Sequence, residues 1–570
     1  MSDGYDFSQL YHASLTSYSP GTTFLATIYQ NRVIIRSTAT LQIVRTWACQ
    51  LPNRPLSSSS FSKTVEDNVK IDYLEWSEDG LHILAFSSIG RTAWIFGLAS
   101  EGDGLSGEVA RIGGEGIEGM VKVEWAKGGS GKCVMVWSDY NLKITIYDLS
   151  NGSTKIIQNP KSLNQCHTYS PDKRYLAVVE KHLGKEYIGV YDMLDNFNLF
   201  RHFQLSALDV QGISWSPCGR YIAVWDSSLS YSMFVHSPLG PLLTQFDHTS
   251  PTFSPTSSTE DPGLGIRTLT WAPGGRWLAL GGWDGKVRIV ESEGWRCVGV
   301  LSWGSRIVEK DVTVWKEPHD WVKDTRGRGI VQFDRVQTPT SIPTTRPDLS
   351  KPNPSIGVSQ ITFDRDGAFL LVRLDNSPNV IHIYTFLKTP TAESPDIQHL
   401  TSMIFENTIK SAEWCPSGSG TGKNRKLAVT VVGRTSAVYI WDEEGGGWEE
   451  ESTDDTKGEL NQVENDGRGG MMEGVGIPSR SDFSANELHW APDGSSVVIQ
   501  DKSRFCLLYM NESEKTDTDT NTNTDRSMRW DDVDEGLSHV VEEEEEEEDI
   551  GGWSGYGLEL RGGLRTAVWA

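Results

Sequence analysis

The sequence lacks the local patterns by which disulfide-linked and metal-binding proteins are usually recognised. Its 7 cysteines stand apart from one another, and the chain contains no C-x-x-C pair. An odd number of isolated cysteines favours a reducing compartment in which the thiols are small core side chains. The 12 histidines form neither H-x-H nor H-E-x-x-H. No local metal motif is therefore present, and we expect neither a metal nor another cofactor.

Long apolar runs and an excess of basic residues are also missing. No uninterrupted apolar segment approaches the ~20 residues that a membrane helix needs, and the first residues include Asp3 and Asp6 without a basic or apolar leader region. We therefore expect a cytoplasmic protein that neither spans a membrane nor is secreted. The formal charge is −25, from 52 Lys+Arg and 77 Asp+Glu, and an acidic chain without a basic stripe argues against nucleic acid as the main ligand.

The negative charge is concentrated in the last quarter of the chain. Residues 1–442 hold 44 acidic and 42 basic residues, whereas residues 443–570 hold 33 and 10. Two segments carry the excess: 443–482, which is rich in Gly, Glu and Asp, and 511–570, which includes the glutamate run 542–548. Like charges repel and bury little, so we predict an acidic low-complexity insert and an acidic, largely disordered C-terminal tail. The tail either only solvates the protein or binds a basic partner.

One pattern recurs nine times along the rest of the chain: an aromatic residue, a turn similar to Ser-Pro-x-Gly and a short apolar strand. The aromatics of successive copies are 44 to 92 residues apart, and the shortest spacings match the ~40 to 45 residues of a WD-repeat blade. Proline fixes φ in the turn and glycine permits the reversal, so each copy predicts two strands joined by a turn. The copies begin at Tyr18, Trp76, Trp125, Tyr169, Trp215, Trp271, Phe363, Trp414 and Trp490.

Strands rich in β-branched and aromatic residues follow most copies, as at 143–148, 286–290 and 437–442, the last of which ends in the dipeptide Trp441-Asp442. The sequence thus predicts an all-β, WD40-type β-propeller with about nine repeats, eight of them within residues 7–442 and the last at 483–510. We favour one contiguous propeller body. The insert at about 303–354, Pro-rich near its end, is either a loop that decorates one ring or a linker between two.

No motif for catalysis stands out. Two Gly-rich turns that precede Lys132 and Lys423 fail the phosphate-loop pattern, because Cys133 and Asn424 occupy its Ser/Thr position. The only dense carboxylates lie in segments predicted to be disordered, where no fixed pKa shift could be maintained. We therefore predict an interaction scaffold rather than an enzyme. The alternatives are a translation-initiation or other RNA-associated propeller, and a hydrolase with its site at the centre of the ring.

A candidate partner-binding motif lies in the acidic tail. Trp530, Val533, Leu537 and Val540 fall at i, i+3, i+7 and i+10, which aligns them on one face of a helix with acidic residues on the other. Such a segment could fold into a partner's groove or pack back on the propeller. Gly536 lowers the stability of the helix by ~1 kcal/mol in either case.

Six segments accompany the repeated turns in a characteristic order: Thr40–Ile43, Leu199–Phe203, Ala223–Asp226, Trp283–Ile289, Asn353–Gly357 and Asp375–Asn379. In this order they resemble the WD-repeat protein of centrosomes and fungal spindle pole bodies, whose vertebrate member is encoded antisense to a p53-related tumour-protein gene. The resemblance covers about residues 7–442 and 483–510. It implies a non-enzymatic adaptor that, with a coiled-coil partner, anchors microtubule minus ends at the spindle pole. In fungi it also implies contact with a minus-end-directed kinesin.

Overall fold

A computed structural model of the chain describes residues 4–50, 69–99, 107–113, 119–128, 131–162, 164–254, 261–325, 328–348, 350, 355–387, 395–417, 425–433, 436–444, 469–478 and 483–510. These residues belong to one compact unit. They are almost entirely β, with one short helix, α1 (Trp321–Asp324), and one 3-10 turn, η1 (Asp139–Asn141). Within this part of the chain no helix has the length and apolar character needed to cross a membrane.

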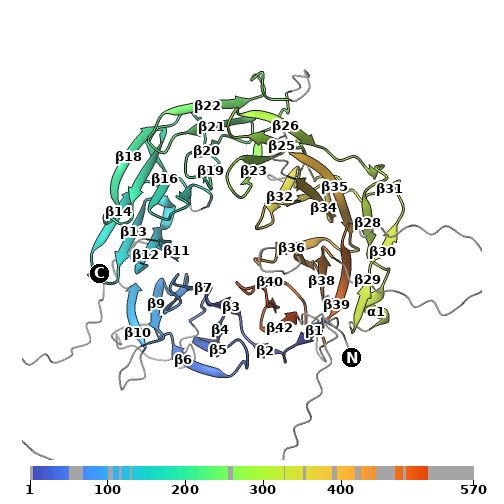
Figure 1. The fold of residues 1–570 in the computed structure, drawn as a ribbon. Coiled ribbons are helices and arrows are strands. Elements are labelled where there is room, and N and C mark those ends of the chain that lie inside the picture. Colours follow the sequence, from blue (N-terminus) through green and yellow to red (C-terminus); the bar gives the residue numbers. More distant parts are fainter. Residues whose placement is uncertain are drawn as a thin grey trace, which may run out of the picture. The chain divides into compact units, whose positions relative to one another are not determined.

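Nine antiparallel sheets follow one another around a ring, and each provides one blade of a β-propeller (Figure 1). Blades 1 to 3 contain β3 (Leu15–Tyr18), β4 (Phe24–Tyr29), β5 (Arg32–Ser37) and β6 (Ile43–Ala48); β7 (Tyr73–Trp76), β8 (His82–Ser87), β9 (Thr92–Gly97) and β10 (Glu108–Gly113); and β11 (Met120–Trp125), β12 (Cys133–Ser138), β13 (Lys143–Asp148) and β14 (Thr154–Gln158). Blades 4 to 6 contain β15 (His167–Tyr169), β16 (Tyr175–His182), β17 (Lys185–Asp192) and β18 (Asn198–Gln204); β19 (Gly212–Trp215), β20 (Ile222–Trp225), β21 (Ser232–His236) and β22 (Leu242–Asp247); and β23 (Ile266–Trp271), β24 (Trp277–Gly282), β25 (Val287–Glu291) and β26 (Arg296–Leu301).

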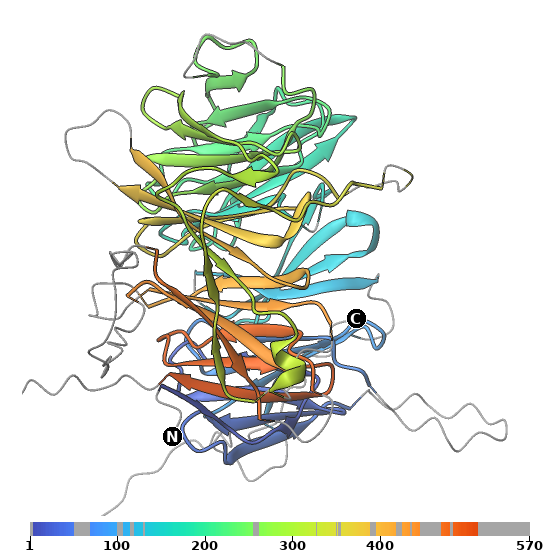
Figure 2. The same ribbon diagram turned by 90° about the vertical axis from the view of Figure 1, so that its right-hand side faces the viewer.

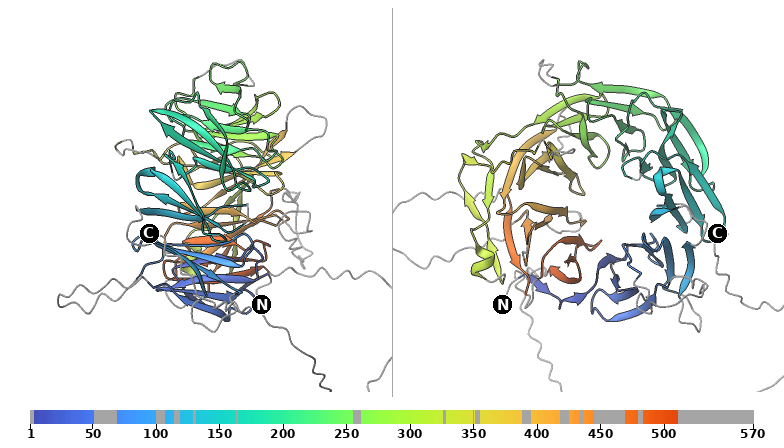
Figure 3. Two further views of the ribbon diagram at one scale, coloured as in Figure 1. Left: turned by 90° about the vertical axis from the view of Figure 1, so that its left-hand side faces the viewer. Right: turned by 180° about the vertical axis from the view of Figure 1, so that it is seen from behind.

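Blades 7 and 8 contain β32 (Val358–Phe363), β33 (Phe369–Leu374), β34 (Ser377–Leu387) and β35 (Asp396–Ile404), and then β36 (Ile409–Trp414), β37 (Lys426–Val431), β38 (Ala437–Asp442) and β39 (Met471–Gly476). Blade 9 contains β40 (Glu487–Trp490), β41 (Ser496–Gln500) and β42 (Arg504–Met510). The first strand of each blade lies on the inner side of the ring and the last on the outer side (Figures 1 and 3). The predicted fold class is confirmed, and the nine repeats form a single propeller.

The repeated turn is held by a pair of hydrogen bonds across the first hairpin of a blade. The Ser77 amide donates to the His82 carbonyl (2.9 Å), and the Ser77 hydroxyl accepts the His82 amide (2.9 Å). Gly275 shows why the turn ends in glycine in most blades. Its φ is +73°, and a Cβ there would lie 2.9 Å from the amide nitrogen of Cys218, in the turn of the preceding blade. The turns of blades 5 and 6 therefore approach each other through a position that only glycine can occupy without strain.

The tryptophan of the repeat links neighbouring blades. In four blades its indole N–H donates to a backbone carbonyl on the inner strand of the preceding blade. In each case the acceptor residue comes directly before the aromatic residue that begins the repeat of the preceding blade. The pairs are Trp76 with Ser17 (3.0 Å), Trp125 with Glu75 (3.2 Å), Trp414 with Thr362 (3.3 Å) and Trp490 with Glu413 (2.9 Å). A directional bond of this kind fixes how one blade sits against the next, in addition to the apolar packing between them.

Two N-terminal strands complete the last blade. β1 (Tyr5–Phe7) pairs antiparallel with β42, with Phe7 opposite Leu508, and β2 (Tyr11–His12) pairs with β42 further along. Ser8 bonds Leu507 twice: its amide donates to the Leu507 carbonyl and its hydroxyl accepts the Leu507 amide, both at 2.9 Å. Residues far apart in the sequence thus share blade 9 and close the ring.

Residues 306–325 and 328–341, which lie inside the predicted insert, form a strap on the outside of blades 7 and 8 (Figure 2). β27 (Arg306–Ile307) pairs with β31 (Thr340–Ser341) and so joins the two ends of the strap. β28 (Thr313–Lys316) runs parallel to β35, the outer strand of blade 7, and β30 (Asp334–Val336) pairs with β28. β29 (Ile330–Gln332) pairs with β39, the outer strand of blade 8. The insert therefore decorates one ring and does not link two.

β39 lies inside the range 443–482, which the sequence assigned to the acidic insert. The segment forms a strand that is buried on both faces. Met472 and Val475 are three residues apart and so point to opposite faces, one into the apolar cluster between blades 7 and 8 and the other into the cluster between blades 8 and 9. The strand pairs with β38 along its whole length. The acidic composition of the preceding residues hid this short strand.

Glu317 at the end of β28 connects the strap to blade 8. Its side chain is only 3% exposed. One carboxylate oxygen accepts the indole N–H of Trp321 (2.8 Å) and the hydroxyl of Tyr439 (2.6 Å), and the other accepts the amide of Glu406 (2.7 Å). The carboxylate thus accepts three hydrogen bonds: one from the strap, one from blade 8 and one from the segment that connects blades 7 and 8.

We predict that Phe7→Asp lowers the free energy of unfolding by about 2 kcal/mol, because it places a charge against the apolar side of blade 9 and opens the ring closure. Gln9→Asp is the matched control, since it adds the same charge at an exposed position. The measurement is the midpoint of urea unfolding for the two variants and the unmodified protein. Equal midpoints for both variants would contradict the proposed closure.

We predict that Glu317→Ala lowers the free energy of unfolding by about 3 kcal/mol, because three buried donors lose their acceptor. Glu317→Gln keeps one amide oxygen as an acceptor, so its loss is smaller. Asp311→Ala, on an exposed strap residue, should change stability little. Differential scanning calorimetry gives the order of stability of the three variants, and a Glu317→Ala protein as stable as Asp311→Ala would refute the role of this carboxylate.

Candidate protein-binding surface

A hollow of about 410 Å³ lies between blades 4 and 5. It is formed where the first turns of the two blades stack and where the β21–β22 turn of blade 5 reaches them. It is lined by Ser170, Pro171, Asp172, Tyr175, Val190 and Phe200 of blade 4, and by Trp215, Pro217, Cys218, Gly219, Pro238 and Leu239 of blade 5. Most of these side chains are apolar or aromatic, as in sites that bind apolar groups.

The repeated turn chemistry shapes this hollow. The hydroxyls of Ser170 and Ser216 accept the amides of Tyr175 (2.9 Å) and Tyr221 (3.0 Å), which fixes both turns. Gly219 has φ +76°, and a Cβ there would only just reach Pro171, at 3.9 Å. The two turns therefore lie close without filling the space between them, and the hollow is preformed.

The outer strands beside the hollow expose apolar side chains. In β18 nearly every residue is exposed, including Leu199 (52%) and Phe200 (39%). In β22 and the turn before it, Leu239, Leu242 and Leu243 are between 43% and 59% exposed. Figure 3, left, shows the side of the ring that carries β18. Leu199 pairs with Tyr191, whose side chain packs between blades 3 and 4, so Leu199 faces away from the hollow. Exposed apolar side chains around a hollow are typical of a protein-binding surface, and we call Phe200, Leu239, Leu242 and Leu243 with the hollow the blade 4–5 surface.

Three arginines surround the aromatic part of the blade 4–5 surface. Arg174 lies over the Tyr175 ring (5.1 Å) and Arg201 over the Phe200 ring (4.4 Å). Arg220 lies over the neighbouring Tyr221 ring at 5.8 Å. Inside the hollow, the Ser170 hydroxyl bonds Asp172 and lowers the pKa of that carboxyl. Arg174 also forms an ion pair with Asp192 (2.9 Å). The surface thus has an apolar floor and a charged rim to which Arg201 and Arg220 contribute.

Cys218 is the one cysteine that is not buried, and it lines the hollow. Partial burial opposes ionisation of its thiol, but hydrogen bonds from the Ser216 hydroxyl and from Arg220 outweigh this effect, so its pKa lies below the usual value. Burial raises the pKa of Cys49 and Cys506 to about 12. Cys218 is therefore the most accessible of the cysteines and has a thiol that ionises readily.

We predict that limiting iodoacetamide modifies Cys218 before any other cysteine of the folded protein, because the thiolate is the reactive form and the other thiols are buried. Peptide mass spectrometry after a short reaction gives the order of modification. Cys218→Ser should abolish the first modification, whereas simultaneous labelling of several cysteines would contradict the arrangement of the hollow.

The structure places the segments behind the family resemblance in two different settings. Leu199–Phe203 lies in the exposed strand β18. Trp283, Ile356 and Asp375 instead meet at the junction of blades 6 and 7. There Arg267 donates to the Asp375 carboxylate (2.6 Å) and to the Ile356 carbonyl (2.5 Å), and lies over the Trp283 ring (4.7 Å). These residues hold the two blades together, whereas β18 is available to a partner.

The predicted tail motif, Trp530, Val533, Leu537 and Val540, lies outside the described residues. Sequence analysis missed the blade 4–5 surface, because its residues come from five separate stretches of two repeats. A partial signal was present in Leu199-Phe200 and Leu242-Leu243, where two consecutive apolar residues interrupt the alternation expected of an outer strand.

Comparison with known proteins gives relatives that also contain WD repeats. No protein-family model matches the chain. The chain is 25% identical over 530 residues to the WD repeat-containing protein WRAP73 of Mus musculus, which covers 90% of this chain and 97% of the mouse protein. It is 21% identical over 301 residues to the uncharacterized WD repeat-containing protein C32H8.09 of Schizosaccharomyces pombe, covering 52% of this chain and 56% of the yeast protein.

Among solved structures, the C-terminal WD40 domain of Sif2 superimposes with a TM-score of 0.41 at 10% identity, covering 89% of this chain and 99% of that domain. The β-propeller domain of Cps50 (Swd1) from Myceliophteria thermophila gives a TM-score of 0.38 at 10% identity, covering 69% and 97%. The chain is a WD-repeat β-propeller that is similar over 90% of its length to mouse WRAP73.

Proposed function

We propose that the protein is a non-enzymatic adaptor at the spindle pole body or centrosome, where it binds a coiled-coil partner and with it anchors microtubule minus ends during spindle assembly. Two findings support the proposal: the resemblance of segments such as Leu199–Phe203 and Trp283–Ile289 to that family, and the similarity to WRAP73 along almost the whole of both chains. The observation that carries the binding role is the blade 4–5 surface.

The blade 4–5 surface suits an amphipathic helix. The apolar side chains of a coiled-coil seam repeat every 3.5 residues and are flanked by charged residues, often glutamates. In our proposal the seam lies across Phe200, Leu239 and Leu242, and acidic flanks pair with Arg201 and Arg220. Because the turns fix this surface before binding, association orders few groups and costs little conformational entropy. A minus-end-directed kinesin is a further partner that the family resemblance suggests.

We predict that the double variant Leu239→Asp/Leu242→Asp binds its coiled-coil partner at least tenfold more weakly, because two desolvated apolar contacts are replaced by charges. The two residues are 59% and 43% exposed, so thermal unfolding should not change. Leu183→Asp is the matched control: this fully exposed leucine belongs to the β16–β17 hairpin of blade 4, at the end of the sheet away from the hollow.

The measurement is affinity capture of the tagged full chain from mitotic cells, with quantitative mass spectrometry and imaging of the spindle pole. We expect the unmodified chain and the control variant to recover a coiled-coil spindle-pole protein and to localise to the spindle pole. The double variant should lose both the coiled-coil partner and the signal at the pole. Recovery of ribosomal or initiation components instead, or a protein that stays diffuse in mitosis, would overturn the adaptor function.

A further inference from the structure

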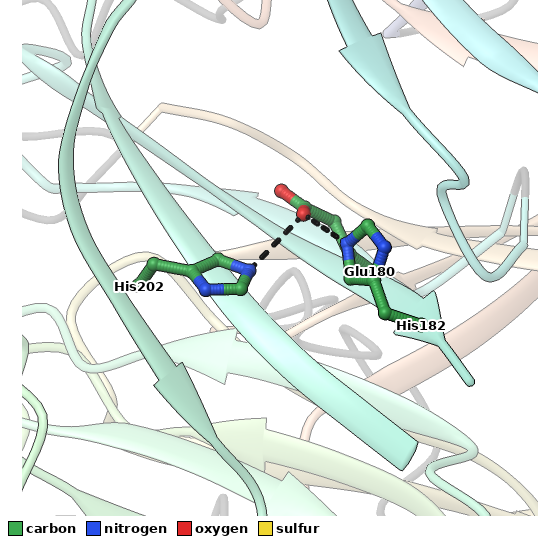
Figure 4. Close-up of side chains that lie close together, drawn as sticks. All are labelled: Glu180, His182 and His202. Atoms are coloured by element: carbon green, nitrogen blue, oxygen red, sulfur yellow. Dashed lines mark hydrogen bonds and ion pairs between the residues drawn. The ribbon is translucent and has the colours of Figure 1, made fainter. Parts of the chain in front are cut away.

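Two histidines and a buried glutamate converge on the outer half of blade 4 (Figure 4). Glu180 and His182 come from the end of β16, and His202 comes from β18, on the other side of β17. One oxygen of the Glu180 carboxylate lies 2.9 Å from His182 Nε2 and 3.3 Å from His202 Nε2. The sequence did not reveal this group, because its donors follow the spacing Glu-x-His with the second histidine twenty residues later.

The three donor atoms are spaced as the ligands of one metal ion. They all lie within 4.8 Å of one another. Zinc binds imidazole nitrogen and carboxylate oxygen at about 2.0 to 2.2 Å in tetrahedral geometry, which separates neighbouring donors by roughly 3.4 Å. The two measured contacts to Glu180 are close to that separation, so small side-chain rotations would open a space for the ion. The two histidine side chains are about one-third exposed (33% and 34%), which leaves the fourth position open to water.

The surroundings hold the ligands in place before any ion binds. The Tyr191 hydroxyl donates to the second oxygen of Glu180. The Tyr187 ring stacks on His202, with ring centres 4.9 Å apart and planes 7° apart. A Cβ at Gly189 would lie 2.2 Å from the Glu180 carboxylate, so only glycine leaves room for it. Outer contacts of this kind orient metal ligands in proteins.

The charge balance also favours a cation. The Glu180 side chain is only 5% exposed, and a buried carboxylate is costly unless its charge is compensated. In the part of the chain that the structure describes, its partners are Tyr191, His182 and His202, with no lysine or arginine among them. None of these three groups carries a permanent positive charge. A divalent ion would supply the missing positive charge. Histidine binds metals as the neutral imidazole, so both histidines could act as ligands without a charge of their own.

We propose that Glu180, His182 and His202 form a zinc site that ties the end of β16 to the outer strand β18. Two imidazole nitrogens and one carboxylate oxygen are a donor set that suits Zn²⁺ better than Mg²⁺ or Ca²⁺, which prefer oxygen ligands. The site is independent of the proposed adaptor function, because it needs no partner protein. It joins two strands of one blade, so its role is to stiffen the outer edge of the ring.

The test uses the full chain, freed of metal with a chelator and titrated with Co²⁺, whose visible absorption reports four-coordinate nitrogen and oxygen ligation. We expect one Co²⁺ per chain, displaced by Zn²⁺, and a higher thermal midpoint in the presence of Zn²⁺. His182→Asn and His202→Asn should each weaken binding at least tenfold, and Tyr191→Phe by about tenfold. Both histidines are partly exposed, so the variants should melt like the unmodified protein when the chelator is present.

Two control variants separate this site from other carboxylates and histidines. His489→Asn removes a histidine that lies beside a single carboxylate, Glu413 (3.7 Å), and should leave the titration unchanged. His319→Asn disrupts a second group, which also contains Asp320 and Glu406. This variant should likewise leave the Co²⁺ titration unchanged. Three results would each overturn the proposal. Co²⁺ binding could be absent or fail to saturate, it could survive in both His182→Asn and His202→Asn, or it could be lost in His319→Asn instead.

Discussion

The fold depends on how each blade is fixed to the one before it, and the tryptophan of the repeat provides the directional part of that contact. An indole N–H that donates to the inner strand of the preceding blade, as Trp490 does to Glu413, sets the position of the new blade. The stacked turns, with Gly275 against Cys218, set the spacing at one end of the sheets. The indole contact recurs at four of the nine blade junctions, and an apolar cluster lies between every pair of neighbouring blades. Together these contacts turn a tandem repeat into a ring.

A ring assembled from pairwise contacts must still be closed, and it needs support wherever a blade is interrupted. Closure comes from β1 and β2, which complete blade 9 beside β42. Blade 8 carries the longest interruption between its third and fourth strands, and the strap supports it by pairing β29 with β39 and by seating Glu317 against Tyr439. Among the residues that the structure describes, no further strand pairs with the outer strands of blades 4 and 5. The apolar side chains of β18 and β22 are therefore exposed there, and the ring can present them to a partner.

The sequence predicted the features that depend on neighbouring residues and missed those that depend on distant ones. Each Ser-Pro-x-Gly turn is a local arrangement, so the nine hairpins and the all-β fold were predictable from patterns such as Trp215 to Val224. Pairing of Phe7 with Leu508 joins residues about five hundred positions apart, and no local pattern specifies such a pair. β39 was hidden by the acidic composition around it. The blade 4–5 surface and the Glu180 group were missed because their residues meet only after the strands are placed.

Amide hydrogen exchange of the full chain tests the closed ring most directly. β42 lies between β41 and the N-terminal strands, so its amides should exchange as slowly as those of a central strand such as β24, and only on global unfolding. An outer strand with one free edge, such as β18, should exchange faster. If the peptide Arg504–Met510 instead exchanged as fast as β18, the N-terminal strands would not be paired with the last blade, and the closed nine-bladed ring would be contradicted.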